Sequence, residues 1–153
     1  MNESPRYDFP VLKVAPRYAK MLLSGRKEWE FRRHRLPTHT AMLMHDGAAF
    51  VGLVVFDVFV RSNVAYATWS AVRPMPGGDR LGGVTGEMCE ERGWKFAFRV
   101  RRCSARGLPR IVAVQLPRAS GGKATIELPD GVPPFMDAID YLYGKDGEEG
   151  GAK

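Results

Sequence analysis

Residues 50–60, FVGLVVFDVFV, constrain the fold of this 153-residue chain more strongly than any other segment. The segment is almost continuously apolar and rich in valine and phenylalanine, which are favoured in β-strands. Residues 94–103 show a second strand pattern, in which Trp94, Phe96 and Phe98 alternate with smaller or basic side chains at a period of two. We expect both segments to lie at the centre of a β-sheet.

The remaining segments predict short elements in an irregular order. We expect further strands at 11–14, 27–33, 41–45, 111–116 and 125–128, and helices at 16–24, 68–72, 85–92 and 133–143. This order does not alternate regularly enough for a doubly wound parallel sheet. It favours an α+β fold: a small β-barrel or strongly bent sheet of about six strands, with three or four short helices packed on it.

Length and composition indicate one ordinary globular domain. Hydrophobic residues make up 44% of the chain and charged residues 26%, so a folded core is feasible. We place the domain at 11–144, with flexible termini at 1–10 and 145–153. No apolar stretch approaches the length of a membrane span and the first ten residues lack a secretory pattern, so we expect a cytoplasmic protein that does not bind membranes.

Cysteine and histidine usage gives no sign of a metal or cofactor. Cys89 and Cys103 are the only cysteines and do not form a CxxC pair. His34, His39 and His45 gather in one stretch, but their spacing matches no zinc-ligand pattern. The glycines of residues 77–86 match neither a P-loop nor a dinucleotide fingerprint. We therefore expect no metal, no cofactor and no disulfide.

The chain has a formal net charge of +6, and its charged residues are distributed unevenly along the sequence. Residues 1–36 carry nine basic and four acidic side chains, and residues 92–123 carry nine basic and no acidic side chains. Residues 124–153 are acidic, with two basic and seven acidic side chains. If the fold brings the two basic segments together, they form a positive face that attracts a polyanion. The alternative is ordinary solvated arginine.

The segment Val11–Arg33 carries the most informative motif. It predicts a strand, a helix that begins near Pro16 and ends at Gly25, and a second strand. Within it stands a GxKxxExR pattern, made here by Gly25, Lys27, Glu30 and Arg32. In this context the segment resembles the opening of ASCH domains, and the likeness extends over roughly the first 60 residues.

This resemblance implies a PUA-like mixed β-barrel and a cleft lined by Gly25, Lys27, Glu30 and Arg32. It also implies that RNA or a modified nucleoside binds there. Some relatives are amidohydrolases that remove the acyl group from N4-acetylcytidine with a lysine, a threonine three residues later and a downstream glutamate. Lys27 matches the lysine, but Glu30 stands where the threonine would be. The downstream glutamate would be Glu87, Glu90 or Glu91.

The chemistry of these residues supports both a functional and a structural interpretation. In a ligand site Lys27 offers a point charge to a phosphate, Glu30 accepts a hydrogen bond from a base amino group, and Arg32 donates to a phosphate or carbonyl. If the protein is an enzyme, Lys27 and Glu30 are the candidate catalytic pair. The structural alternative is an ion pair between Glu30 and Arg32. Because a regular strand would place Lys27 on the opposite face, we expect the strand to start after Lys27 or to contain a bulge.

A second candidate surface lies on the basic side of residues 94–103. Lys95, Arg99, Arg101 and Arg102 are the candidates for contacting a nucleic-acid backbone, continued by Arg106 and Arg110. Trp94, Phe96 and Phe98 should point to the other side, which does not favour a broad stacking platform. A third possibility is a regulatory domain whose acidic tail contacts a basic protein partner.

Overall fold

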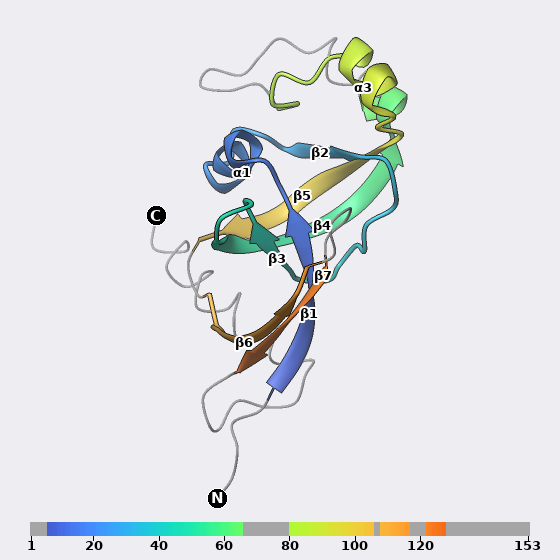
Figure 1. The fold of residues 1–153 in the computed structure, drawn as a ribbon. Helices are drawn as coiled ribbons and strands as arrows, with labels where there is room; N and C mark the ends of the chain where they lie inside the picture. The colour runs from blue at the N-terminus through green and yellow to red at the C-terminus, as the bar shows by residue number, and fades with distance from the viewer. Residues whose placement is uncertain (1–5, 66–79, 106–107, 117–121, 128–153) are drawn as a thin grey trace, which may run out of the picture. The chain divides into compact units, whose positions relative to one another are not determined.

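The structure is a computed structural model that describes residues 6–65, 80–105, 108–116 and 122–127 (Figure 1). Its elements follow the order β1 (Arg6–Lys13), α1 (Pro16–Leu23), β2 (Trp29–Arg32), β3 (Met42–His45), β4 (Phe50–Arg61), α3 (Gly86–Arg92), β5 (Phe96–Ser104), β6 (Arg110–Gln115) and β7 (Gly122–Glu127). The strands predicted from sequence are all present, most within a few residues of their expected bounds. The expected helices at 68–72 and 133–143 and the acidic tail lie outside the described residues.

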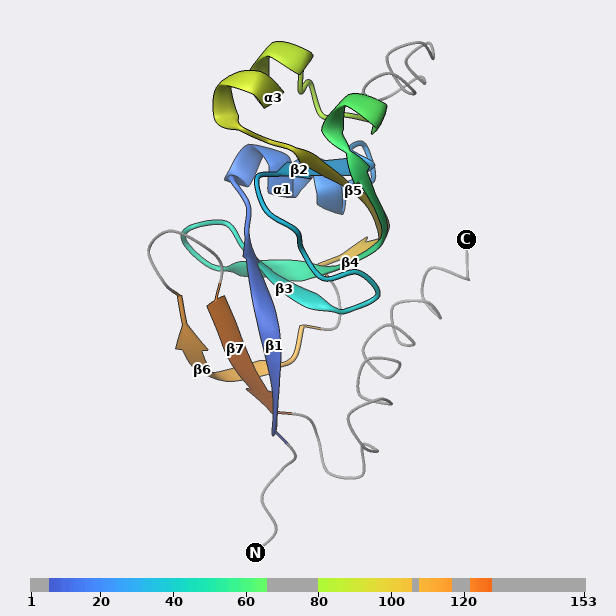
Figure 2. The same ribbon diagram turned by 90° about the vertical axis from the view of Figure 1, so that its right-hand side faces the viewer.

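The chain divides into two compact units, and each is described here by itself. The first contains residues 1–14, 41–53 and 104–153. Its strands β1 and β3 pair in parallel, whereas β7 pairs antiparallel with both β1 and β6. The strands β6, β7 and β1 run side by side in both views (Figure 1, Figure 2).

Strand β1 begins earlier than the sequence indicated. Residues 6–10 were expected to belong to a flexible lead, but Arg6 to Pro10 pair in register with Glu127 to Lys123 of β7. The pairing places Phe9 opposite Ala124 and Tyr7 opposite Ile126. Phe9 is almost completely buried. A polar start of the chain thus joins the sheet because a long-range strand partner satisfies its backbone groups.

The second unit contains residues 15–40 and 54–103 and carries the GxKxxExR motif. Helix α1 starts with Pro16 at its first turn and buries Ala19 and Leu22, consistent with the fixed φ that favours proline at this position. Strand β2 pairs antiparallel with β5, from Trp29 opposite Arg99 to Arg32 opposite Phe96. A core cluster of Trp29, Phe31, Ala65, Leu81, Val84 and Ala97 packs in this unit.

The sheet is mixed, as expected, but it is not closed. Backbone hydrogen bonds order the seven strands β2-β5-β4-β3-β1-β7-β6. Among the described residues the first and last strands of this order, β2 and β6, do not pair with each other, so the barrel prediction is wrong for this part of the chain. The described segments include two of the expected helices, α1 and α3. None of their helices is long and apolar enough to cross a bilayer.

Candidate functional site

The end of α1 determines where Lys27 lies. Gly25 adopts a φ of 78°, a conformation that favours glycine, and thereby turns the chain out of the helix. The backbone N–H groups of Arg26 and Lys27 then both donate to the carbonyl of Met21, each at 3.1 Å. Strand β2 begins only at Trp29. Lys27 therefore precedes the strand, which is one of the two arrangements we expected. The alternation of side chains along β2 does not determine where the Lys27 side chain points.

Lys27, Glu30 and Arg32 form a continuous chain of charged contacts. The Lys27 ammonium donates to Glu30 Oε1 at 2.8 Å and also to the carbonyl of Trp29. Arg32 donates to Glu30 Oε2 through Nη2 at 2.8 Å and through Nε at 3.2 Å. The predicted convergence of these three side chains is thus present in the structure. We call the three residues the charged cluster.

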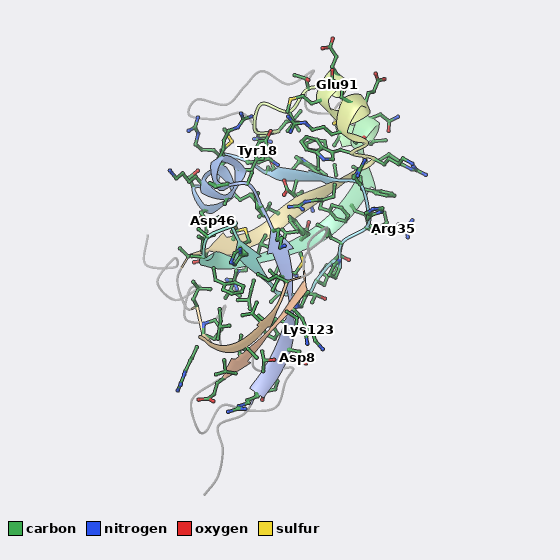
Figure 3. All side chains as sticks on the ribbon, in the orientation of Figure 1. Asp8, Tyr18, Arg35, Asp46, Glu91 and Lys123 are labelled. Carbon is green, nitrogen blue, oxygen red and sulfur yellow. The ribbon has the colours of Figure 1, made fainter. Side chains whose placement is uncertain are left out.

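The charged cluster is buried at one end and reaches solvent at the other. Lys27 is 2% exposed and Glu30 is 4% exposed, whereas the side chain of Arg32 is 26% exposed. The Lys27 ammonium also lies 5.4 Å from the ring centre of Tyr18 and 5.6 Å from that of Phe31, within cation–π range. Figure 3 labels Tyr18 beside α1.

A turn at residues 80–84 covers the stem of Lys27. The carbonyl of Arg80 accepts the N–H groups of Glu28 at 2.8 Å and Trp29 at 3.2 Å, which fixes the turn to the start of β2. Gly82 packs against the methylene groups of the Lys27 side chain: a Cβ atom at Gly82 would be 2.6 Å from Lys27 Cδ and Cε. The sequence predicted no role for the glycines of residues 77–86, because no local pattern links Gly82 to Lys27.

Electrostatics keeps Glu30 ionised within this buried site. Burial by itself raises the pKa of the Glu30 carboxyl, but the charges of Lys27 and Arg32 and the hydrogen bonds they donate outweigh this effect and bring the pKa below its ordinary value of 4.5. With two cations and one anion, the charged cluster has a net charge of +1. Its surface-exposed member is a guanidinium, which is suited to binding phosphate or a carbonyl oxygen.

The three candidate glutamates lie on helix α3. Glu87, Glu90 and Glu91 are all exposed, and Figure 3 shows Glu91 extending outward from α3. Cys89 of α3 is half-buried, and the charge of Lys27 affects the pKa of its thiol. Burial raises the pKa of the Cys89 thiol, and the positive charge of Lys27 opposes this rise. Burial thus favours the neutral form of the Cys89 thiol.

The basic residues of β5 do not form one uniform cationic face. Lys95, Arg101 and Arg102 are exposed, whereas Ala97 between them is fully buried. Arg99 makes a two-pronged ion pair with Asp57, with both N···O distances at 3.1 Å. This pair raises the pKa of Arg99. In the other unit Arg110 lies 3.6 Å from Glu127, and Arg106 lies outside the described residues.

Comparison with known proteins identifies the fold. No family model matches the chain, and no curated protein does so. Among solved structures, the chain is similar to two variants of ASCH from Zymomonas mobilis, one with a serine replaced by alanine and one with a tyrosine replaced by phenylalanine. Each aligns with 17% identity and a TM-score of 0.50, over 88% of this chain and 94% or 96% of the ASCH chain. The chain therefore has an ASCH-like fold.

Proposed function

Because the chain has an ASCH-like fold, we propose that it binds RNA or a modified nucleoside through the charged cluster. The observation that carries this proposal is the net positive charge of Lys27, Glu30 and Arg32, which reaches solvent at the Arg32 guanidinium. A partly exposed guanidinium held by a buried carboxylate is preorganised to donate hydrogen bonds to a phosphate or a base carbonyl, since Glu30 has already restricted its rotamer.

The three residues have different roles in this proposal. Arg32 contacts the ligand, because it is the most exposed member of the charged cluster. Glu30 holds the guanidinium by accepting two hydrogen bonds from it, and Lys27 neutralises Glu30 from the buried side. Gly25 contributes through its backbone, which ends α1 and directs the chain toward Lys27. Direct contact of a ligand with Lys27 requires the turn at residues 80–84 to move.

The test is the binding of fluorescein-labelled single-stranded RNA, followed by anisotropy over a range of salt concentrations. We expect affinity to fall steeply as salt increases, because cations of the protein displace counterions from the phosphates. Arg32→Ala should weaken binding about tenfold or more, and Arg32→Lys should recover only part of it because lysine lacks the planar fork. Native wild-type protein that binds neither RNA nor a nucleoside would exclude the proposal.

Lys20→Ala is the matched control for loss of charge. Lys20 is exposed on α1 of the same unit, and its substitution removes one positive charge without touching the charged cluster. We expect this variant to bind RNA almost as wild type does. An equal loss of affinity in Lys20→Ala and Arg32→Ala would mean that net charge alone, and not the charged cluster, determines binding.

Hydrolysis of an acylated nucleoside is the second candidate function. The 2.8 Å contact between Lys27 Nζ and Glu30 Oε1 favours it, since an amine and a carboxylate are in position to exchange a proton. The lowered pKa of Glu30 makes it a weak base, which favours binding over hydrolysis. Incubation with N4-acetylcytidine distinguishes the two functions: release of cytidine that is abolished in Lys27→Ala supports hydrolysis, and no release supports binding alone.

A further inference from the structure

An exposed phenylalanine lies beside two arginines in the unit that contains the charged cluster. Phe59 of β4 is 38% exposed, and its ring centre is 6.2 Å from that of Phe96 of β5, in an edge-to-face arrangement. The Arg35 guanidinium carbon lies 4.7 Å from the ring centre of Phe59 and 5.8 Å from that of Phe96. Arg61 lies 5.5 Å from the ring centre of Phe96. We call these four residues the Phe59 surface.

The Phe59 surface is positively charged. Arg35 and Arg61 are both exposed, and neither has a carboxylate within 4 Å in the described part of the chain. The nearby Asp57 of β4 is occupied by its two-pronged pair with Arg99. Lys95 adds a further exposed cation at this end of the strands, because its carbonyl accepts the N–H of Ser62, the residue that follows Arg61.

Strand register connects the Phe59 surface to the charged cluster. Arg32 of β2 stands directly opposite Phe96 of β5. Directly opposed residues on neighbouring strands project to the same side of a sheet, about 4.5–5.5 Å apart at Cβ. The partly exposed guanidinium of Arg32 and the ring of Phe96 therefore lie on the same side of β2 and β5, and Phe59 packs edge-to-face against that ring. Figure 3 shows Arg35 beyond the end of β2 that carries Arg32.

We infer that the Phe59 surface binds an unpaired base of single-stranded RNA next to the phosphate contact of Arg32. A base stacks on aromatic rings and on guanidinium planes, and every base has such a face. The two arginines hold the flanking phosphates, which matches the positive charge of this surface. A protein partner would need carboxylates to neutralise the same arginines. This inference rests on the proposed function, because it places RNA at the charged cluster.

The experiment uses single-stranded RNA that contains 2-aminopurine, whose fluorescence is quenched when the base stacks. With the full-length wild-type protein we expect salt-dependent binding and a change in 2-aminopurine fluorescence. Phe59→Leu keeps an apolar side chain but removes the ring, so we expect affinity to fall about 5- to 150-fold, the range that stacking supplies. The slope of affinity against salt should not change, because no charge is lost. Phe59→Tyr retains a ring and should bind nearly as wild type does.

Val58→Leu is the matched control. Val58 is also 38% exposed and is the neighbour of Phe59 on β4, so in a regular strand it faces the opposite side. Its substitution should leave RNA binding unchanged, and unfolding curves of all variants show whether each is folded. Equal RNA affinity of the wild-type protein and Phe59→Leu would overturn this inference while leaving the proposed function intact. Wild-type protein that does not bind RNA at all would overturn this inference and leave only nucleoside binding of the proposed function.

Discussion

At the scale of single residues, Gly82 limits what can change around Lys27. A methyl group at this position would lie 2.6 Å from Lys27 Cδ and Cε, and Gly82 has a φ of 68°. We expect Gly82→Ala to lower the free energy of unfolding by about 2–4 kcal/mol, through the strained backbone and the displaced lysine stem. Urea unfolding followed by circular dichroism measures this change.

Gly83→Ala separates the effect of backbone strain from the effect of the steric clash with Lys27. Gly83 has a φ of 76°, but a Cβ atom there would meet nothing within 4 Å. It therefore carries the backbone penalty of about 1 kcal/mol without the clash. Equal losses in the two variants would show that Gly82 does not press on Lys27.

Glu30 should make stability depend on pH in the acid range. The pKa of Glu30 is lower in the folded protein than its ordinary value of 4.5. Between these two values the unfolded chain binds more protons than the folded chain. The stabilisation is therefore complete above about pH 4.5 and is lost as pH falls through the folded-state pKa. Urea midpoints measured from about pH 7 to about pH 3 should decrease accordingly.

Glu30→Gln is the comparison for this pH dependence. The pKa values of Asp46 and Asp57 are also lowered, so wild type has other sources of acid sensitivity. The quantity to compare is the slope of stability against pH. The substitution removes the carboxylate that Lys27 and Arg32 contact, so we expect it to lower stability above about pH 4.5, and we expect the two proteins to converge in acid, where Glu30 of the wild type is protonated. If the slopes of wild type and Glu30→Gln coincide, Glu30 does not contribute.

The residues of the charged cluster were predictable from sequence, but their burial was not. Spacing along the chain brings Lys27, Glu30 and Arg32 together because Gly25 ends α1 and β2 begins just after Lys27. Burial depends on Gly82, which comes from a distant turn. The exposure of Phe59 was likewise not predictable, because a continuous apolar run such as residues 50–60 does not reveal which of its residues are left exposed.

At the scale of elements, the start of helix α3 is determined by residues close together in the sequence, and it was therefore predictable. Thr85 precedes the helix, which we expected at 85–92, and its Oγ1 accepts the N–H of Met88 at 3.2 Å. We expect Thr85→Ala to destabilise the protein by about 1 kcal/mol, because this N–H loses its partner, and Thr85→Ser to retain most of the stability. Chemical unfolding of the two variants measures the difference. Equal losses would exclude a capping role.

The pattern of β5 was predicted less well than its position. Alternation assigned Ala97 to the basic side and Phe98 to the core, yet both are fully buried. Strand β5 lies between β2 and β4. Ala97 packs in the cluster with Trp29 and Phe31, while the ring of Phe98 packs against Phe56 and Phe59. A strand covered on both sides does not show a clean two-residue period.

At the scale of the whole molecule, the basic residues allow two routes for RNA. One comprises Arg35 and Arg61 at the Phe59 surface, and the other comprises Arg101 and Arg102 near the opposite end of β5. We expect Arg35→Ala/Arg61→Ala to reduce the slope of log affinity against log salt by about 1.4, at about 0.7 for each lost phosphate contact. Arg101→Ala/Arg102→Ala should change it little. Anisotropy titrations at several salt concentrations decide between the routes, and the reverse result would assign the phosphates to Arg101 and Arg102.

Sheet closure was the architectural feature that sequence reasoning could not decide. Strand-forming segments were identifiable because their composition and period are local properties. Whether an order of strands closes into a barrel depends on pairing between its first and last members, here β2 and β6. No property of residues 29–32 or 110–115 alone indicates that pairing.

The burial of Lys27 beneath Gly82 also makes this amine a reporter of motion. Amine-acylating reagents modify exposed lysines such as Lys20, Lys95 and Lys123 quickly, whereas a 2%-exposed lysine reacts only when its cover opens. The rate at which Lys27 gains an acyl group, followed by mass spectrometry of its peptide, therefore measures how often the turn at residues 80–84 lifts away.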